Sequence, residues 1–213
     1  MQIQNDEIYH HVYNRGAHKA NIFLDNSDYI RMVKLLYIAN NDEPFILSRL
    51  SENVFAIDRK KILVDIVAYC LMPNHIHIAL KKRTPGKSRP RDNMTIFIHK
   101  LMTGYSSYYN KKYSHSGTIW QGAYKEKPVY DGTYIESLIN YIHLNPCDLI
   151  DPLKNTLEAR VDFAMNYEYS SLRDFNGVIR PQSVILTDVK GVEVRPLHKP
   201  AHCIGQTSTA ICG

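Results

Sequence analysis

Residues 71–80 read Leu71-Met72-Pro73-Asn74-His75-Ile76-His77-Ile78-Ala79-Leu80, an apolar stretch interrupted by a turn and two histidines. Met72-Pro73-Asn74 is typical of a tight turn, so we expect a hairpin with strands over residues 62–71 and 75–82. In the second strand, the side-chain period of two puts His75 and His77 on one face, about 7 Å apart. The two rings are either ligands of a divalent metal or hydrogen-bonded histidines on a half-exposed face, and only a third ligand or a reacting group elsewhere can decide.

The segments around this hairpin predict the rest of the fold. We expect a strand over residues 8–14, a helix over 28–40 behind capping residues at 25–27, and a long amphipathic helix over 93–113. A fourth strand or an extended edge is expected over 118–125, and a last helix should end near Asn145 because Pro146 disfavours helical geometry before it. This order predicts an α+β, ferredoxin-like or RRM-like fold, a single antiparallel sheet with helices on one face, plus a C-terminal helix.

The composition favours one ordinary globular domain with a polyanionic partner. The chain has 213 residues, 44% hydrophobic residues and a net charge of +5, which suits a domain over 1–180 and a loosely ordered tail over 181–213. No apolar run reaches the ~20 residues of a membrane span, and the polar start has no signal-peptide pattern, so we expect a cytoplasmic protein with no membrane association. The four cysteines lack CxxC spacing and are expected to be free thiols.

Much of the positive charge follows the two histidines directly. Residues 81–91 contain six basic residues and no acidic one: Lys81, Lys82, Arg83, Lys87, Arg89 and Arg91. A charge run is usually a solvated loop. Because this one continues from the strand that carries His75 and His77, it indicates a phosphate backbone passing nearby.

The last predicted helix presents a second polar pair. Its apolar stripe runs through Ile135, Leu138, Ile139 and Ile142. At about 100° per residue, Tyr141 lies off the centre of this stripe and Asn145 lies one turn later on the same flank. A phenol and an amide therefore project together, although each alone would be an ordinary residue at the edge of a core.

Four motifs occur together in an order that is known from one protein family: His11-Val12-Tyr13-Asn14-Arg15-Gly16, Met72-Pro73-Asn74-His75-Ile76-His77, Trp120-Gln121-Gly122-Ala123-Tyr124-Lys125 and Tyr141-Ile142-His143-Leu144-Asn145-Pro146. With them, residues 8–175 resemble the single-tyrosine HUH transposases of small insertion sequences, and among these the REP-associated tyrosine transposases most of all.

This resemblance implies a metal-dependent endonuclease and strand transferase that acts on hairpin-containing single-stranded DNA, as a monomer or a homodimer. Tyr141 would attack the scissile phosphate, giving a 5′-phosphotyrosine and a free 3′-OH. His75, His77 and Asn145 would hold Mg²⁺ or Mn²⁺. Arg15 and Lys125 would join the basic run in binding DNA.

Two positions depart from the family pattern, and two other functions stay open. Asn145 stands where insertion-sequence members carry Gln, which favours the REP-associated branch, and Ala123 stands where relatives commonly carry Arg. The alternatives are a module that binds single strands without cutting them and a phosphoesterase that uses water. Only a tyrosine nucleophile leaves a covalent protein–DNA adduct. Whether the tyrosine acts in cis or in trans is left open.

Overall fold

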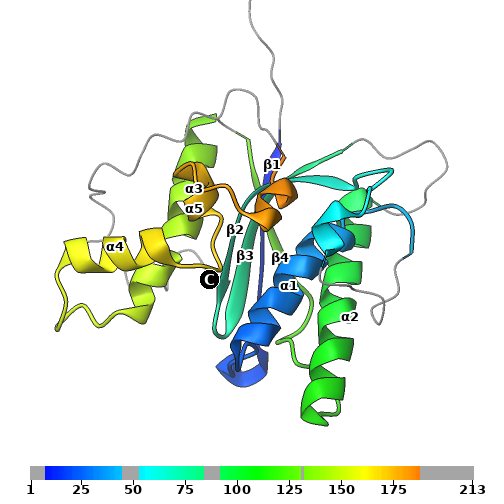
Figure 1. The fold of residues 1–213 in the computed structure, drawn as a ribbon, viewed down its shortest axis with the longest axis horizontal. Helices are drawn as coiled ribbons and strands as arrows, with labels where there is room; N and C mark the ends of the chain where they lie inside the picture. The colour runs from blue at the N-terminus through cyan, green and yellow to red at the C-terminus, as the bar shows by residue number, and fades with distance from the viewer. Residues whose placement is uncertain (1–7, 45–52, 84–91, 131, 188–213) are drawn as a thin grey trace, which may run out of the picture.

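The structure is a computed structural model that describes residues 8–44, 53–83, 92–130 and 132–187 (Figure 1). Its strands are β1 (Tyr9–Arg15), β2 (Val64–Met72), β3 (His75–Lys82) and β4 (Lys125–Val129). Its α-helices are α1 (Asn26–Ile38), α2 (Asn93–Tyr113), α3 (Gly132–Leu144), α4 (Leu157–Asn166) and α5 (Leu172–Phe175). Short 3-10 turns cover Ala17–Lys19, Val54–Ala56, Asn145–Leu149 and Pro181–Ile185.

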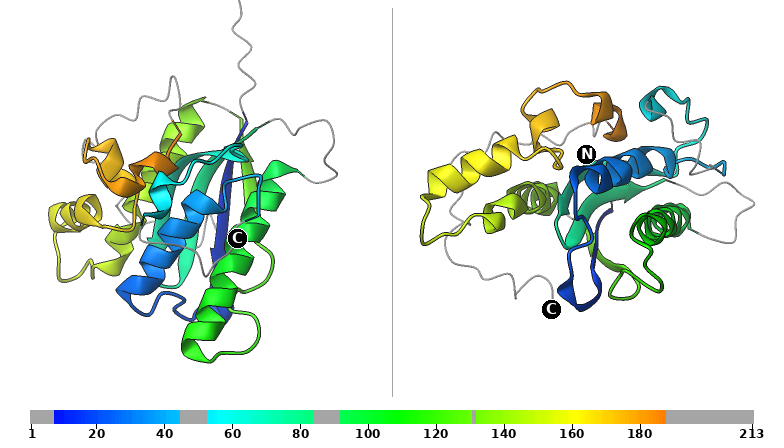
Figure 2. Two further views of the ribbon diagram at one scale, coloured as in Figure 1. Left: turned by 45° about the vertical axis from the view of Figure 1, so that its right-hand side comes forward. Right: turned by 60° about the horizontal axis from the view of Figure 1, so that its bottom comes forward.

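The four strands form one antiparallel sheet in the order β2-β3-β1-β4. Apolar side chains of α1 and α2 pack on one face of this sheet, where Val12, Ile76 and Ile78 are buried. Helix α3 packs on the other face, over β2 and β3, through Ile135, Ile139 and Ile142. Figure 2 shows α3 and the pair α1 and α2 on opposite sides of the sheet. The predicted fold class is confirmed, and the C-terminal helix lies on the face that the first two helices leave free.

The tip of the β2–β3 hairpin is held by the segment that follows β1. The Pro73 carbonyl accepts hydrogen bonds from the backbone of Ile22 and Phe23, at 2.8 and 3.1 Å, and the Asn74 carbonyl accepts one from Gly16 at 2.8 Å. A Cβ on Gly16 would lie 2.2 Å from the Ala20 carbonyl oxygen, so only glycine fits this close approach. The hairpin end that carries His75 is therefore fixed in place.

Two predicted boundaries are wrong, one slightly and one substantially. Helix α1 begins at Asn26, because Asp25 is its N-cap in a capping box with Asp28. The predicted strand over 118–125 is instead an irregular segment with one bridge, between Gly16 and Trp120, and the strand itself runs over Lys125–Val129. Trp120 turns inward there, is buried, and donates from its indole Nε1 to Ser106 on α2 at 3.0 Å.

The first residues that the sequence places in the tail pack against the domain. Ile185 is fully buried, and the Thr187 backbone donates to the Ile66 carbonyl of β2 at 3.0 Å. Residues 188–213, with two of the four cysteines, lie outside the described residues. Cys70 and Cys147 are buried free thiols, as expected. In the described part of the chain, no helix has the length and apolar character to cross a membrane.

Candidate active site

The sheet register assembles the site on the face that α3 covers in part. Residues of β3 and β1 lie opposite each other in the pairs His75–Arg15 and His77–Tyr13. β4 continues the rows, because Tyr13 pairs with Lys125, and His11 pairs with Lys127. Since paired residues point to the same face, three histidines, one tyrosine and three cations share one surface.

The two predicted ligands His75 and His77 lie side by side, with ring centres 4.9 Å apart and perpendicular planes. Nδ1 of His75 lies 2.6 Å from Oδ1 of Asn74, and Nδ1 of His77 lies 2.9 Å from Nε2 of His11. His75 is half-buried, whereas His77 is only 1% exposed. A ring on a half-exposed sheet face would be partly open to solvent, whereas the rings of Tyr13 and Tyr141 cover His77.

Burial keeps these rings neutral. It lowers the pKa of His75 to about 4 against an opposing hydrogen bond from Asn145, with a smaller contribution in the same direction from the Arg15 charge. It lowers the pKa of His11 to about 4, and it lowers that of His77 well below the usual range. A neutral imidazole is the form that binds a metal, so the site is prepared for this role at neutral pH.

Helix α3 brings the other two predicted residues to the same place. The Tyr141 ring stands nearly perpendicular to the His77 and His11 rings, at centre distances of 5.5 and 5.8 Å. Asn145 is buried, donates from Nδ2 to the Tyr141 carbonyl at 2.7 Å, and hydrogen-bonds the His75 ring with its side chain. Tyr141, His75, His77 and Asn145 are thus gathered from two distant segments.

The end of α3 is fastened to β2 by a buried polar contact. Nε2 of His143 lies 2.8 Å from Oγ of Ser171. This hydroxyl also accepts from the backbone N–H of Tyr69 at 2.9 Å and contacts the Tyr69 carbonyl at 3.2 Å. The contact fixes the helix two residues after Tyr141.

Three cations line the part of this face that α3 does not cover. Arg15 lies on β1 beside His75, and the Nζ atoms of Lys125 and Lys127 each lie 6.0 Å from the centre of the Tyr13 ring. No acidic residue shares this face of the two described strands β1 and β4, since Glu126 points to the other face and pairs with His10 at 2.6 Å. Arg15 and Lys125 were predicted to bind DNA; Lys127 was missed because the strand was placed too early in the chain.

The basic run lies at the other end of β3. Lys82 lies five positions along the strand from His77, which is about 17 Å. Lys82 pairs with Glu126 and Asp92, at 3.5 and 3.6 Å, and Arg83 pairs with Asp65 at 2.6 Å. Lys81 lies opposite Tyr9, whereas Lys87, Arg89 and Arg91 lie outside the described residues. Binding of DNA by this run stays a prediction.

The imidazoles of His75 and His77 and the amide of Asn145 suit a metal ion that binds nitrogen and amide-oxygen ligands. Within the described residues, no three His, Cys, Asp or Glu side chains come together as metal ligands. A metal at His75 and His77 would therefore need Asn145 as its third protein donor, and the contact between Asn145 and His75 fits this requirement.

Comparisons with known proteins agree with the motifs. Residues 42–145 match a family described as "Transposase IS200 like". No curated protein sequence matches the chain. Among solved structures, the chain is similar to "Structure of the REP associates tyrosine transposase bound to a REP hairpin", with 12% identity over 83% of this chain and 84% of that chain, and a TM-score of 0.52. The predicted family resemblance is confirmed.

Proposed function

We propose that this chain, whose residues 42–145 match the IS200-like transposases, cleaves and rejoins single-stranded DNA with Tyr141 as the nucleophile. The observation that supports this best is the position of the Tyr141 ring, 5.5 Å from the ring of His77 and on the same helix end as Asn145, which hydrogen-bonds His75. A nucleophile and three candidate metal ligands therefore occupy one small region.

The proposed reaction conserves the energy of the phosphodiester bond. The Tyr141 oxygen forms a bond to phosphorus while the bond from phosphorus to the 3′ oxygen breaks. The phenol loses a proton and the 3′ oxygen gains one. The products are a 5′-phosphotyrosine and a 3′-OH, and attack by another 3′-OH reverses the step and rejoins DNA, so no nucleotide cofactor is needed.

His75, His77 and Asn145 would hold Mg²⁺ or Mn²⁺, which would polarise the scissile phosphate and neutralise its charge. The chain prepares for this by keeping the imidazoles neutral through burial. Arg15, opposite His75 in the sheet, supplies a permanent positive charge beside the same phosphate.

The substrate that fits this face is a single strand next to a DNA hairpin. The similar structure described above is of a protein bound to a REP hairpin. In this chain, α3 covers β2 and β3, and the cations Arg15, Lys125 and Lys127 lie on β1 and β4. A phosphate backbone that crosses β4 and β1 would meet these charges before it reaches Tyr141.

Tyr141 would act in cis. Helix α3 buries Ile135, Ile139 and Ile142 against the sheet of its own chain, and His143 ties its end to Ser171. The nucleophile and the three candidate metal ligands therefore all come from one chain, so a monomer would carry out the cleavage.

The test is an adduct that survives denaturation. Single-stranded oligonucleotides with a hairpin, incubated with the protein and Mg²⁺, should yield a covalent protein–DNA species that Tyr141→Phe lacks. Tyr134→Phe is the matched control, because Tyr134 lies on the same helix and is 68% exposed; this variant should form the adduct. Cleavage without an adduct would mean that water is the nucleophile, and binding without cleavage would mean a binding module.

A further inference from the structure

The neighbour of His75 determines which of its nitrogens carries the proton. Nδ2 of Asn74 donates to the Lys19 carbonyl at 3.2 Å, which orients the amide so that Oδ1 faces Nδ1 of His75 at 2.6 Å. An amide oxygen can only accept a hydrogen bond, so Nδ1 of His75 must be the donor. Asn145 also hydrogen-bonds this ring and favours its protonated form. Where the 2.6 Å contact to Asn74 prevails, the neutral ring has its lone pair on Nε2.

The partner of His77 is another histidine. Nδ1 of His77 and Nε2 of His11 lie 2.9 Å apart between two buried rings, so one proton lies between them. Because this contact occupies Nδ1, only Nε2 of His77 is left to bind a ligand. A lone pair on that Nε2 requires the proton on Nδ1, with His11 as the acceptor.

We propose that Asn74 and His11 are positioning residues, matched acceptors that hold His75 and His77 in the same tautomer, each with the proton on Nδ1 and Nε2 ready to coordinate. His11 has a second contact that serves the same site, because its ring packs against the edge of Tyr141 at 5.8 Å. One imidazole thus orients a ligand and the nucleophile together.

The backbone around Asn74 supports this assignment. The Lys19 carbonyl that orients the amide belongs to a tight turn in which His18 and Lys19 have positive φ values of 54° and 61°. Such a conformation is uncommon for residues other than glycine and needs support from its surroundings. The Lys19 N–H donates to the Gly16 carbonyl at 3.0 Å, and Gly16 in turn donates to Asn74, so the turn and the hairpin tip form one unit.

The purpose of this arrangement and the proton on Nδ1 of His77 rest on the proposed function, whereas the proton on Nδ1 of His75 follows from the contact with Asn74. An acceptor behind a metal-binding histidine fixes its tautomer and ring orientation, and its loss typically lowers metal affinity about 10- to 100-fold. We therefore expect His11→Leu and Asn74→Ala to weaken Mn²⁺ binding by that factor. His11→Gln should restore much of the affinity, because its amide oxygen can accept from His77.

The decisive experiment is NMR of the full chain with ¹⁵N-labelled histidine, without metal or DNA. The ring nitrogen shifts should show His75 and His77 protonated on Nδ1. His11→Leu should change only the His77 pattern, and Asn74→Ala only the His75 pattern. Mn²⁺ affinity of the same variants, from the electron paramagnetic resonance signal of free Mn²⁺, should fall as stated.

Protonation of His77 on Nε2 in the wild-type chain would overturn the proposal. This measurement needs no variant, so it remains decisive even if a variant does not fold. A tautomer pattern that His11→Leu leaves unchanged would do so as well. Because neither result needs DNA, an absent protein–DNA adduct would contradict the proposed function alone.

Discussion

Replacing Lys125 and Lys127 by Gln should weaken DNA binding in a way that depends on salt. Both side chains point to the site face of β4, within 6.0 Å of the Tyr13 ring centre, where a single strand would cross the sheet. Each phosphate that a cation neutralises in a single strand contributes about 0.7 to the slope of log K against log salt. Loss of two contacts should therefore flatten the slope by about 1.4.

The flatter slope corresponds to a measurable difference in how much DNA affinity the two proteins lose as salt rises. Over a fourfold rise in salt, from about 50 to 200 mM, a slope difference of about 1.4 corresponds to roughly sevenfold. The wild-type chain should lose that much more affinity than the double variant. Fluorescence anisotropy of a labelled hairpin oligonucleotide across a salt series measures both slopes.

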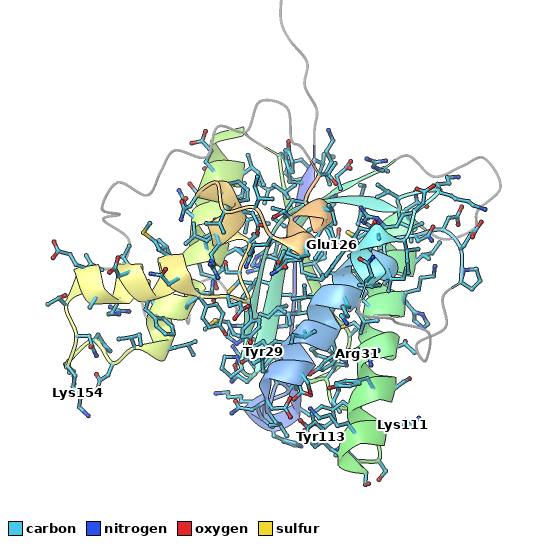
Figure 3. The ribbon with its side chains drawn as sticks, viewed as in Figure 1. Tyr29, Arg31, Lys111, Tyr113, Glu126 and Lys154 are labelled. Carbon is cyan, nitrogen blue, oxygen red and sulfur yellow. The ribbon has the colours of Figure 1, made fainter. Side chains whose placement is uncertain are left out.

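A charge-matched control separates local contacts from net charge. Lys111→Gln with Lys154→Gln removes the same two charges from exposed positions, and Figure 3 shows these lysines on opposite sides of the molecule, on α2 and ahead of α4. The control should keep the wild-type slope. An unchanged slope in the Lys125 and Lys127 variant, or equal flattening in both variants, would refute the proposed path of the strand.

Three further changes test the framework of the site. Gly16→Ala places a Cβ 2.2 Å from the Ala20 carbonyl oxygen, so the loop behind the hairpin tip must shift, and urea unfolding should show a loss of about 1–3 kcal/mol; full stability would mean that the loop moves freely. Ser171→Ala removes the buried partner of His143 and should cost about 1–3 kcal/mol and slow adduct formation; unaltered adduct kinetics would mean that this contact does not position α3. Burial lowers the pKa of His11 to about 4 and that of His143 to about 3. Below about pH 6.5 the unfolded chain therefore takes up protons that the folded chain does not. As the pH falls from there to the folded pKa, each of these histidines should reduce the free energy of unfolding by about 1.4 kcal/mol per pH unit. Urea titrations at pH 7 and pH 5 measure this, and equal stabilities would contradict it.

Local patterns were enough to predict the elements that carry a strong period. The apolar spacing over residues 93–113 predicts α2 with the bounds that the structure has, Asn93–Tyr113. β4 was misplaced because it is an edge strand that reads Lys-Glu-Lys-Pro-Val, with a proline and three charges, whereas the apolar pair Ile119 and Trp120 before it imitates a strand.

In the site, too, local sequence patterns predict some features, and long-range contacts determine the others. The period of a strand places His75 and His77 on one face from the sequence alone. The contact between His11 and His77 joins residues 66 positions apart and depends on the register of β1 against β3, which no local pattern contains. The burial of His77 likewise depends on α3, which returns to the sheet from far along the chain. These longer-range relations are what the structure adds.

The residue that carries the DNA can be identified directly. Trypsin should leave Tyr130, Tyr134 and Tyr141 together in one peptide over residues 126–154, because Lys127 precedes Pro128. After reaction with a hairpin oligonucleotide and nuclease trimming, fragmentation of this peptide by mass spectrometry should place the remaining nucleotide on Tyr141. A nucleotide on Tyr130 or Tyr134, or strand cleavage with no modified peptide, would contradict the assignment of Tyr141 as the nucleophile.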